Sequence, residues 1–407
     1  MKDPLEEAGV EVDRNVATRI LLLFLLALVA LAVFVPGSRT PLIIIAGIIL
    51  LVMFHEFGHF LTAKRAGMKA TEFFLGFGPR LWSFRRGETE YGVKALPLGG
   101  YVRIIGMSSM EDIDPEDEPR TFRAGSTKNR LVVILAGVTV NLLLAWLLFF
   151  VAAAGSGQGN FIRTTTSIDR VAAGSAAAGA KLQSGDRIAA INGTPIKNWK
   201  QLQTGIQNQG GILTTFTIVR AGHIFDVEIT PTITDGVGKL GFYPANDFEH
   251  VSVIGAIPKS FETFGDIAAG SVQSIGRIFS PAGVSDYTKN FTSAAPKAGS
   301  AADLQRPTSV IGIVDQGSQL FDGNIWGILQ LLGAISLILA LFNLLPVLPF
   351  DGGHAVIVVY EGIMSKIKGR RVVFDIRKFI PISAIVVIFL MLISLSAMFL
   401  DIQRIGR

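Results

Sequence analysis

The stretch Phe54-His55-Glu56-Phe57-Gly58-His59 decides how the rest of the chain is interpreted. It has the form His-Glu-x-x-His and ends an uninterrupted run of apolar and small residues that begins at Leu42. Residues four apart on a helix share one face, so His55 and His59 point in the same direction. Two imidazoles placed in this way can hold one Zn²⁺, and Glu56 lies beside them as a candidate general base.

The apolar setting favours a functional interpretation of these three polar side chains. Ionisable residues are costly inside a membrane span, and they mark functional sites there. In a soluble helix the same motif can be a surface group whose polar atoms are satisfied. Within a hydrophobic span, that alternative leaves three polar groups desolvated without compensation. A catalytic zinc takes three protein ligands, so the rest of the chain must supply one more.

The composition predicts a polytopic membrane protein. Half of the 407 residues are hydrophobic, which is too apolar for an ordinary soluble domain. Since the chain has no cysteine, it has no disulfides and no thiolate zinc site. The net charge is +5, and the basic residues gather beside the hydrophobic runs. This pattern indicates membrane orientation and contact with anionic lipid, and it excludes nucleic acid as the expected partner.

Hydropathy predicts five transmembrane helices, of which the first is short. They cover residues 20–35, a second span that opens at Pro41 and carries the metal motif, and residues 131–154, 325–348 and 380–400. Residues 161–233, between the third and fourth spans, are predicted to form a soluble domain.

Lys and Arg residues near the span ends predict the orientation of the chain. They are abundant at the borders of residues 61–130 and 361–379, and sparse at the borders of residues 155–324. The first two segments are therefore predicted to face the cytoplasm together with the N-terminus, and the third to lie outside. The metal motif then lies near the cytoplasmic end of its span.

Residues 61–130 have strand character. An alternating run from Arg80 to Arg85 is followed by a turn at Gly87 and by a second run from Glu90 to Leu96. A third strand is predicted from Leu98 to Ile104. These strands form either a small solvated sheet on the membrane surface or an edge along which an extended peptide binds.

The third ligand is predicted in Asn343-Leu344-Leu345-Pro346-Val347-Leu348-Pro349-Phe350-Asp351-Gly352-Gly353-His354. Two prolines and two glycines argue against a regular helix here, and broken backbone at membrane depth is tolerated where it lines a cavity. Asp351 can complete a His₂-carboxylate zinc site. The alternative for Asp351 taken alone is a helix cap after the proline break. The second and fourth spans run in the same direction, which brings both motifs near one membrane face.

The chain resembles the site-2 protease family of intramembrane zinc metalloproteases, and within it the bacterial branch that carries a PDZ domain between its core spans. The resemblance extends from Pro41 to the last span. Four motifs carry it. Residues 54–59 match the metal helix, and 343–354 match the motif of the third ligand. Gly76-Phe77-Gly78-Pro79 with 96–102 matches the membrane-associated β-hairpin region, and Ser184-Gly185-Asp186-Arg187-Ile188 with 191–196 matches a PDZ core. Two positions depart from the family pattern: Phe350 replaces the usual Leu, and Gly137 is not followed by Pro.

The resemblance implies one Zn²⁺ per chain, with His55, His59 and Asp351 as ligands and Glu56 as the base. Asn343 and Asn141 are implied to bind substrate, and His354 is interpreted as cavity lining. The implied fold is a polytopic α-helical membrane protein with five transmembrane helices, a membrane-associated β-hairpin region and one inserted extracytoplasmic PDZ-like α+β domain. The implied location is the bacterial inner membrane.

Five segments follow from this interpretation. They are an N-terminal tail and extra span (1–36), a core with the metal helix, the β region and the third span (41–154), the PDZ-like domain (160–235), a surface helix and flexible linker (236–324), and the core spans with the third ligand (325–407). The helix after the PDZ-like domain is predicted to lie on the outer membrane surface or to pack on that domain.

The implied function is cleavage of transmembrane segments of single-pass membrane proteins, such as anti-sigma factors or signal-peptide remnants. The PDZ-like domain would receive peptide ends or strands and act as a size filter, or else be a folded spacer. One alternative is a non-enzymatic PDZ membrane scaffold with a vestigial zinc site, although such a site needs no base like Glu56. Another is a metal transporter, although the polar groups converge on one site instead of lining a path.

Overall fold

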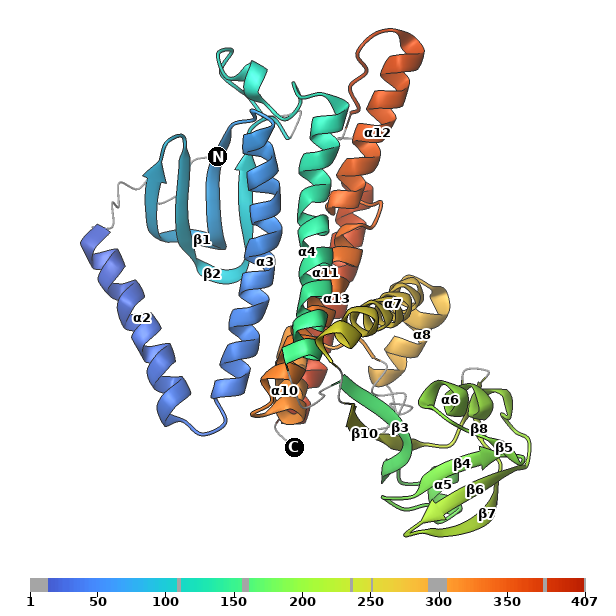
Figure 1. Cartoon of the computed structure of the whole chain (residues 1–407). Helices are drawn as coiled ribbons and strands as arrows, with labels where there is room; N and C mark the ends of the chain where they lie inside the picture. Colours follow the sequence, from blue (N-terminus) through green and yellow to red (C-terminus); the bar gives the residue numbers. More distant parts are fainter. Residues whose placement is uncertain are drawn as a thin grey trace. The chain divides into compact units, whose positions relative to one another are not determined.

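The computed structural model describes residues 14–107, 111–155, 161–234, 237–249, 252–291, 306–375 and 379–405. The chain divides into two compact units. We call residues 1–151, 257–276 and 307–407 the helical unit, and residues 152–256 and 277–306 the β-rich unit. Figure 1 shows the elements of both units, and each unit is described by itself.

The helical unit contains most of the helices and one sheet. Its elements are α2 (Arg14–Phe34), α3 (Arg39–Arg65), β1 (Ala70–Arg86), β2 (Thr89–Ile104), the 3₁₀ turn η1 (Glu118–Arg120), α4 (Thr127–Gly155), the central part of α7 (Val253–Ile278), α10 (Val310–Phe321), α11 (Ile325–Asn343), α12 (Asp351–Lys368) and α13 (Ile380–Ile405).

Four of the described helices are long and apolar enough to cross a membrane. They are α3, α4, α11 and the part of α13 from Ile380 to Gln403. They agree with four of the five predicted spans, and the chain is a polytopic membrane protein. The short first run does form a helix, α2, but its crossing of the membrane stays a prediction.

Small residues let the membrane helices approach one another closely. A Cβ atom added at Gly58 of α3 would lie 2.8 Å from the carbonyl oxygen of Ala136 on α4. A Cβ at Gly47 of α3 would overlap Leu332 of α11, at 2.5 Å from Cδ1. Lipid gives little hydrophobic drive for helix association, so such close contacts carry much of the packing. These contacts hold α3, the helix of the metal motif, against α4 and α11.

The antiparallel sheet of β1 and β2 is folded on itself. Phe73 of β1 pairs with both Tyr91 and Val102 of β2. The first half of β1 therefore lies between the two halves of β2, and the second half of β2 is at an edge. The sequence predicted three strands, and the first half of β1 adds a fourth strand segment.

Aromatic side chains fasten this sheet to α3. The ring of Phe60 lies 5.3 Å from that of Phe73 and 5.8 Å from that of Tyr91, measured between centroids. Gly100 permits the edge of the sheet to approach, because a Cβ there would lie 2.8 Å from Sδ of Met53. The edge half of β2 thus lies directly beside the metal motif.

Helix α7 packs on the helical unit. Phe264 and Ile267 pack against a buried cluster that contains Phe149 of α4 and Leu337 of α11. The ring of Phe261 lies 5.4 Å from that of Trp146. The sequence predicted a position on the membrane surface or on the PDZ-like domain, so this packing against α4 and α11 is a contact that neither alternative included.

The β-rich unit is built on a sheet with strand order β10-β3-β4-β6-β7, and β5 pairs with β4. Its elements are β3 (Phe161–Val171), α5 (Ala176–Gly179), β4 (Arg187–Ile191), β5 (Thr194–Pro195), α6 (Trp199–Asn208), β6 (Thr214–Arg220), β7 (His223–Ile229), β10 (Phe242–Glu249), the separate pair β8 (Thr232–Thr234) and β9 (Val237–Lys239), α8 (Pro281–Thr288) and the 3₁₀ turn η2 (Lys289–Phe291). Because β10 pairs with β3, the sheet includes residues beyond Asp235.

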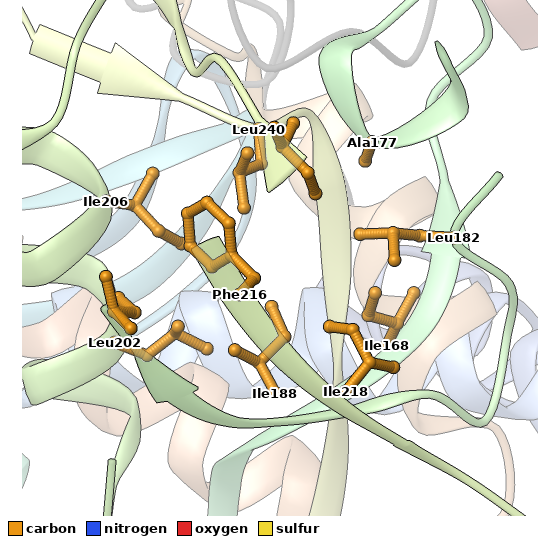
Figure 2. Close-up of a cluster of buried hydrophobic side chains, with 11 residues drawn as sticks. Ile168, Ala177, Leu182, Ile188, Leu202, Ile206, Phe216, Ile218 and Leu240 are labelled. Atoms are coloured by element: carbon orange, nitrogen blue, oxygen red, sulfur yellow. The ribbon is translucent and has the colours of Figure 1, made fainter. Parts of the chain in front are cut away.

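Aliphatic side chains and one phenylalanine fill the core of the β-rich unit (Figure 2). Phe216 and Ile218 of β6 alternate with more exposed neighbours, as expected for a strand with one buried face. The turn at Asn192-Gly193 joins β4 to β5, and both residues have positive φ, +47° and +74°. Two such residues between paired strands form a type I′ turn, which favours Asn-Gly.

Candidate metal centre

His55 and His59 lie one turn apart on α3 and face the same point. Both are buried, and their Nε2 atoms are 3.2 Å apart. The two rings are nearly perpendicular, with an interplanar angle of 81°. The helical spacing predicted this shared face, and the structure confirms it.

Asp351 reaches the same point from the first residue of α12. Its Oδ2 atom lies 3.2 Å from Nε2 of His55 and 3.4 Å from Nε2 of His59. That oxygen is buried and has no hydrogen-bond partner. Within the described part of the chain, these three residues form the one group whose spacing suits a metal ion.

The backbone around Asp351 explains how the carboxylate reaches the site. Helix α11 ends at Asn343, residues 344–350 are irregular, and α12 begins at Asp351. The predicted break is confirmed over 344–350, but Gly352 and Gly353 lie inside the first turn of a helix that the sequence did not predict. A Cβ at Gly352 would lie 2.3 Å from the carbonyl oxygen of Leu344, so only glycine fits so close to the preceding loop.

Hydrogen bonds on the far side of the rings fix the tautomers. Nδ1 of His59 donates to the carbonyl oxygen of Val133 on α4, at 2.8 Å. A proton on Nδ1 leaves the lone pair of Nε2 pointing at Asp351 and His55. This backbone partner leaves no mark in the sequence, since any residue at position 133 supplies the same carbonyl group.

Asn141 of α4 contacts the other ring. Its Nδ2 atom lies 3.3 Å from Nδ1 of His55, while its Oδ1 is buried without a partner. The two ends of an amide are assigned from the hydrogen-bond network, and exchanging them lets Oδ1 accept the proton of Nδ1 of His55. Asn141 is fully buried, and the hydroxyl of Ser336 donates to its backbone carbonyl oxygen at 2.9 Å.

Gly137 leaves room beside both rings. A Cβ there would lie 2.4 Å from Nε2 of His59 and 2.8 Å from Nδ1 of His55. Gly137 and Asn141 are four residues apart and share one face of α4. The sequence analysis did not predict which face of α4 meets the histidines, and this spacing is the signal that identifies it.

Glu56 lies next to the edge of the sheet. Its Oε2 atom accepts a hydrogen bond from the backbone N–H of Val102 on β2, at 3.1 Å. Asn343, in contrast, donates from Nδ2 to the carbonyl oxygen of Leu339 in its own helix, at 3.0 Å. The structure therefore brings Glu56 and Asn141 to the three clustered residues, but it gives Asn343 a partner within α11.

The three clustered residues fit a zinc ion. With both Nδ1 atoms protonated, two imidazole lone pairs and one carboxylate oxygen converge, and none of these acceptors can donate to another. Such a set of acceptors is stable when a cation lies between them. Two histidines and one carboxylate form a ligand set of catalytic zinc, which keeps a fourth position for water or substrate. The three distances and the orphan Oδ2 of Asp351 agree with that chemistry.

Comparisons with known proteins agree with this geometry. Residues 43–390 match the family model described as peptidase family M50. The zinc metalloprotease Rip1 of Mycobacterium tuberculosis is 31% identical over 356 residues, which cover 80% of this chain and 86% of the relative. The zinc metalloprotease Rip1 of Mycolicibacterium smegmatis is 31% identical over 358 residues, with the same coverage of both chains.

Proposed function

This chain belongs to peptidase family M50, the site-2 protease family, and is a zinc metalloendopeptidase; we propose that it cleaves peptide bonds within transmembrane segments of single-pass membrane proteins. The observation that carries the proposal is the position of the clustered residues. His55 and His59 lie on α3, a helix apolar and long enough to span the membrane. A hydrolytic site at that depth acts on peptide that is itself in the membrane.

We assign His55, His59 and Asp351 as the zinc ligands and Glu56 as the general base. A bound zinc ion supplies Lewis acidity and lowers the pKa of a coordinated water. Glu56 takes a proton from the attacking water and passes it to the leaving amine. The N–H group of Val102 holds the Glu56 carboxylate in place before substrate binds. We assign Asn141 to orienting His55, because it is fully buried and contacts Nδ1 of that ring, whereas the family resemblance implies substrate binding for it.

A comparison of the wild type with Glu56→Gln tests the proposal. Both proteins are reconstituted in liposomes with a panel of single-span substrates, and the zinc content of each is measured. Loss of a general base lowers the rate by about 10²–10⁴-fold. We expect this loss in Glu56→Gln, with zinc still present at one ion per chain. Equal cleavage by the two proteins would refute the assignment and favour the alternative of a PDZ membrane scaffold with a vestigial site.

We further propose that the edge of β2 captures the unwound substrate. A peptide bond in a helix is shielded by its hydrogen bonds, so the substrate must be extended before it reacts. The second half of β2 pairs with β1 on one side and lies beside Glu56 on the other. Strand addition at such an edge positions a peptide through its backbone. Val102→Pro removes an edge N–H that also orients Glu56, so KM and kcat are measured separately. Loss of edge capture should raise KM while zinc stays bound, whereas a misplaced base lowers kcat alone; Val102→Ala keeps the N–H and should change neither. Equal KM values for the two variants would refute edge capture.

We propose that the β-rich unit is a PDZ-like domain that binds peptide ends or strands and excludes substrates with large outer domains. Its six-stranded sheet with a packed core supports an independent folding unit. Because β10 belongs to the sheet, a clean deletion removes residues 161–249. The deletion variant should cleave untrimmed substrates. If it still rejects them, the unit is a spacer.

We propose that the chain lies in the bacterial inner membrane with five spans, the N-terminus and active-site end in the cytoplasm, and the β-rich unit outside. The absence of cysteine makes labelling of single-cysteine variants unambiguous. An impermeant thiol reagent added outside should label Ser38→Cys, in the turn between α2 and α3, and should not label Lys368→Cys at the end of α12. Labelling of both variants, or of Lys368→Cys alone, would contradict this topology.

A further inference from the structure

A large open cavity lies on the side of the helical unit formed by α3, α4 and α12. Its volume is about 840 Å³, towards the upper end for ligand pockets, which run from about 300 to 1,000 Å³. The wall is mostly apolar and includes Gly58 of α3, Val132 and Val140 of α4, and Ile363 of α12. Neither the metal ligands nor Glu56 line it. Figure 1 shows α3, α4 and α12 running side by side. We call this cavity the α3–α4–α12 groove.

Two lysines lie at one end of the groove. Lys128 is in the first turn of α4, Lys366 is in the last turn of α12, and both line the cavity. Among the described residues, neither lysine forms a hydrogen bond or an ion pair. Two lysines elsewhere in this unit are paired with carboxylates: Lys64 lies 2.8 Å from Glu88 and Lys69 lies 2.5 Å from Asp117. The groove therefore ends in two cationic groups that the protein itself does not neutralise.

The nearest acidic group on α12 is already neutralised. Glu361 is buried and forms an ion pair of 2.6 Å with Arg130 of α4. Its other oxygen accepts from the backbone N–H of Phe374. Glu361 is thus unavailable to Lys366, and its charge is balanced within the protein. An anion at the mouth of the groove would meet the two lysines.

The length of the groove matches one leaflet of a bilayer. On α4 its lining runs from Lys128 to Val140, which is about 18 Å at 1.5 Å per residue. The hydrocarbon core is about 30 Å thick, so one leaflet contributes about 15 Å. A spanning substrate helix needs a path through both leaflets. An acyl chain needs one, with its headgroup at the charged end.

We propose that the α3–α4–α12 groove binds one anionic glycerophospholipid, with an acyl chain along Val132 and Val140 and its phosphate between Lys128 and Lys366. The groove reaches Gly58, where α3 and α4 are in close contact one residue before the metal histidine His59. A lipid in this position fills the space behind the metal helix and supports its packing on α4. The same protein in a bilayer without anionic lipid lacks that support.

The test uses full-length protein in nanodiscs of phosphatidylcholine containing a minor fraction of phosphatidylglycerol. The lipids retained per chain are counted by native mass spectrometry. We expect one phosphatidylglycerol on the wild type, and at least fivefold less on Lys128→Gln/Lys366→Gln. The matched control is Lys368→Gln/Arg370→Gln, which removes two charges just beyond the groove and should retain the lipid.

A second variant fills the groove and leaves both lysines in place. Val132 is half exposed and lines the cavity, so Val132→Trp should exclude the acyl chain and reduce retained phosphatidylglycerol to the same extent. Leu143→Trp is its control, because Leu143 is an exposed residue of α4 outside the lining. Zinc content and helicity establish that each variant is folded.

Three results would overturn the proposal. One is equal retention of phosphatidylglycerol by the wild type and both groove variants. Another is equal retention of phosphatidylcholine and phosphatidylglycerol by the wild type. The third is displacement of the retained lipid by a single-span substrate peptide that photo-crosslinks to position 132, which would make the groove a docking site for substrate.

Discussion

Two aspartates with buried carboxylate oxygens, one in each unit, have opposite surroundings. Asp186 of the β-rich unit is fully buried, and Arg220 donates to both of its oxygens, at 2.6 and 2.7 Å. The backbone N–H of Gln183 adds a third hydrogen bond at 2.8 Å. Asp351 of the helical unit has an Oδ2 that is buried among two imidazole nitrogens without a hydrogen bond.

The difference shows how a structural carboxylate is told apart from a metal ligand. Buried polar atoms in folded proteins are nearly always hydrogen-bonded, so an orphan oxygen needs an explanation. Asp186 has all its partners inside the chain, and its role is to fold the β-rich unit. Asp351 lacks them, and an ion supplies the missing interaction. Burial alone would have ranked Asp186 above Asp351 as a candidate site.

The largest expected effect comes from removing the charge that faces the histidines. Asp351→Asn keeps the volume of the side chain but replaces an anionic ligand with an amide. We expect zinc content to fall from one ion per chain to a small fraction of that value, and proteolysis to fall to background. Metal analysis of the purified variant and a liposome cleavage assay measure the two quantities. Asp186→Asn is the matched control and should keep its zinc. Full zinc in Asp351→Asn would remove Asp351 from the ligand set.

Gly137→Ala should weaken zinc binding without altering a ligand. The added methyl group would overlap Nε2 of His59 and press on the ring of His55. Changes that misplace zinc ligands in this way cost about 10–100-fold in affinity or activity. The affinity is measured by competition with a zinc chelator. Gly270→Ala on α7 is the control, since a Cβ there meets nothing within 4 Å. Equal zinc affinities for the two variants would mean that α4 shifts at position 137 and accommodates the added methyl group without displacing the histidines.

Asn141 and Asn343 provide a contrast between two amides. Asn141→Leu removes the group that contacts Nδ1 of His55, and we expect about a 10–100-fold loss of zinc affinity. Asn343→Leu removes a hydrogen bond to Leu339 within α11, and zinc affinity should stay within threefold of the wild type. Chelator competition on both variants measures the difference. A larger loss in Asn343→Leu would mean that Asn343 supports the zinc site and Asn141 does not.

The sequence predicted the parts of this comparison that rest on side-chain type and spacing. His55 and His59 are identifiable because helical periodicity puts them on one face. Asp351 is identifiable because a carboxylate follows a break in an apolar span. Four spans follow from hydropathy alone. Each of these signals is a property of residues close together in the chain.

What the sequence did not predict depends on backbone groups brought from elsewhere. The carbonyl oxygen of Val133 and the N–H of Val102 hold His59 and Glu56, yet every residue has such groups. Helix α12 was missed because Gly352 and Gly353 are usually helix-breaking. Here they are required by the contact with Leu344, a contact that appears only in three dimensions. The packing of α7 on α4 and α11 was missed for the same reason.

The smallest expected effect is a dependence of the β-rich unit on acid. The hydrogen bonds from Arg220 hold the pKa of Asp186 below its usual value of 3.8. A carboxyl group whose pKa is lowered by folding stabilises the native state above the unfolded pKa, and that contribution is lost as the pH falls towards the folded pKa. The β-rich unit should therefore lose stability as the pH drops below about 4, because protonation breaks the pair with Arg220.

Asp186→Asn isolates this contribution, since the amide cannot ionise. The variant should melt several degrees below the wild type at pH 7, and the gap should narrow as the pH approaches 3, because the wild type loses its carboxylate and the variant has none to lose. Limited proteolysis of residues 161–249 in the full chain, across temperature and pH, measures both trends. A gap that stays constant from pH 7 to pH 3 would mean that Asp186 stabilises the unit by its shape and hydrogen bonds and not by its charge. The contrast with Asp351 would then rest on the hydrogen bonds alone.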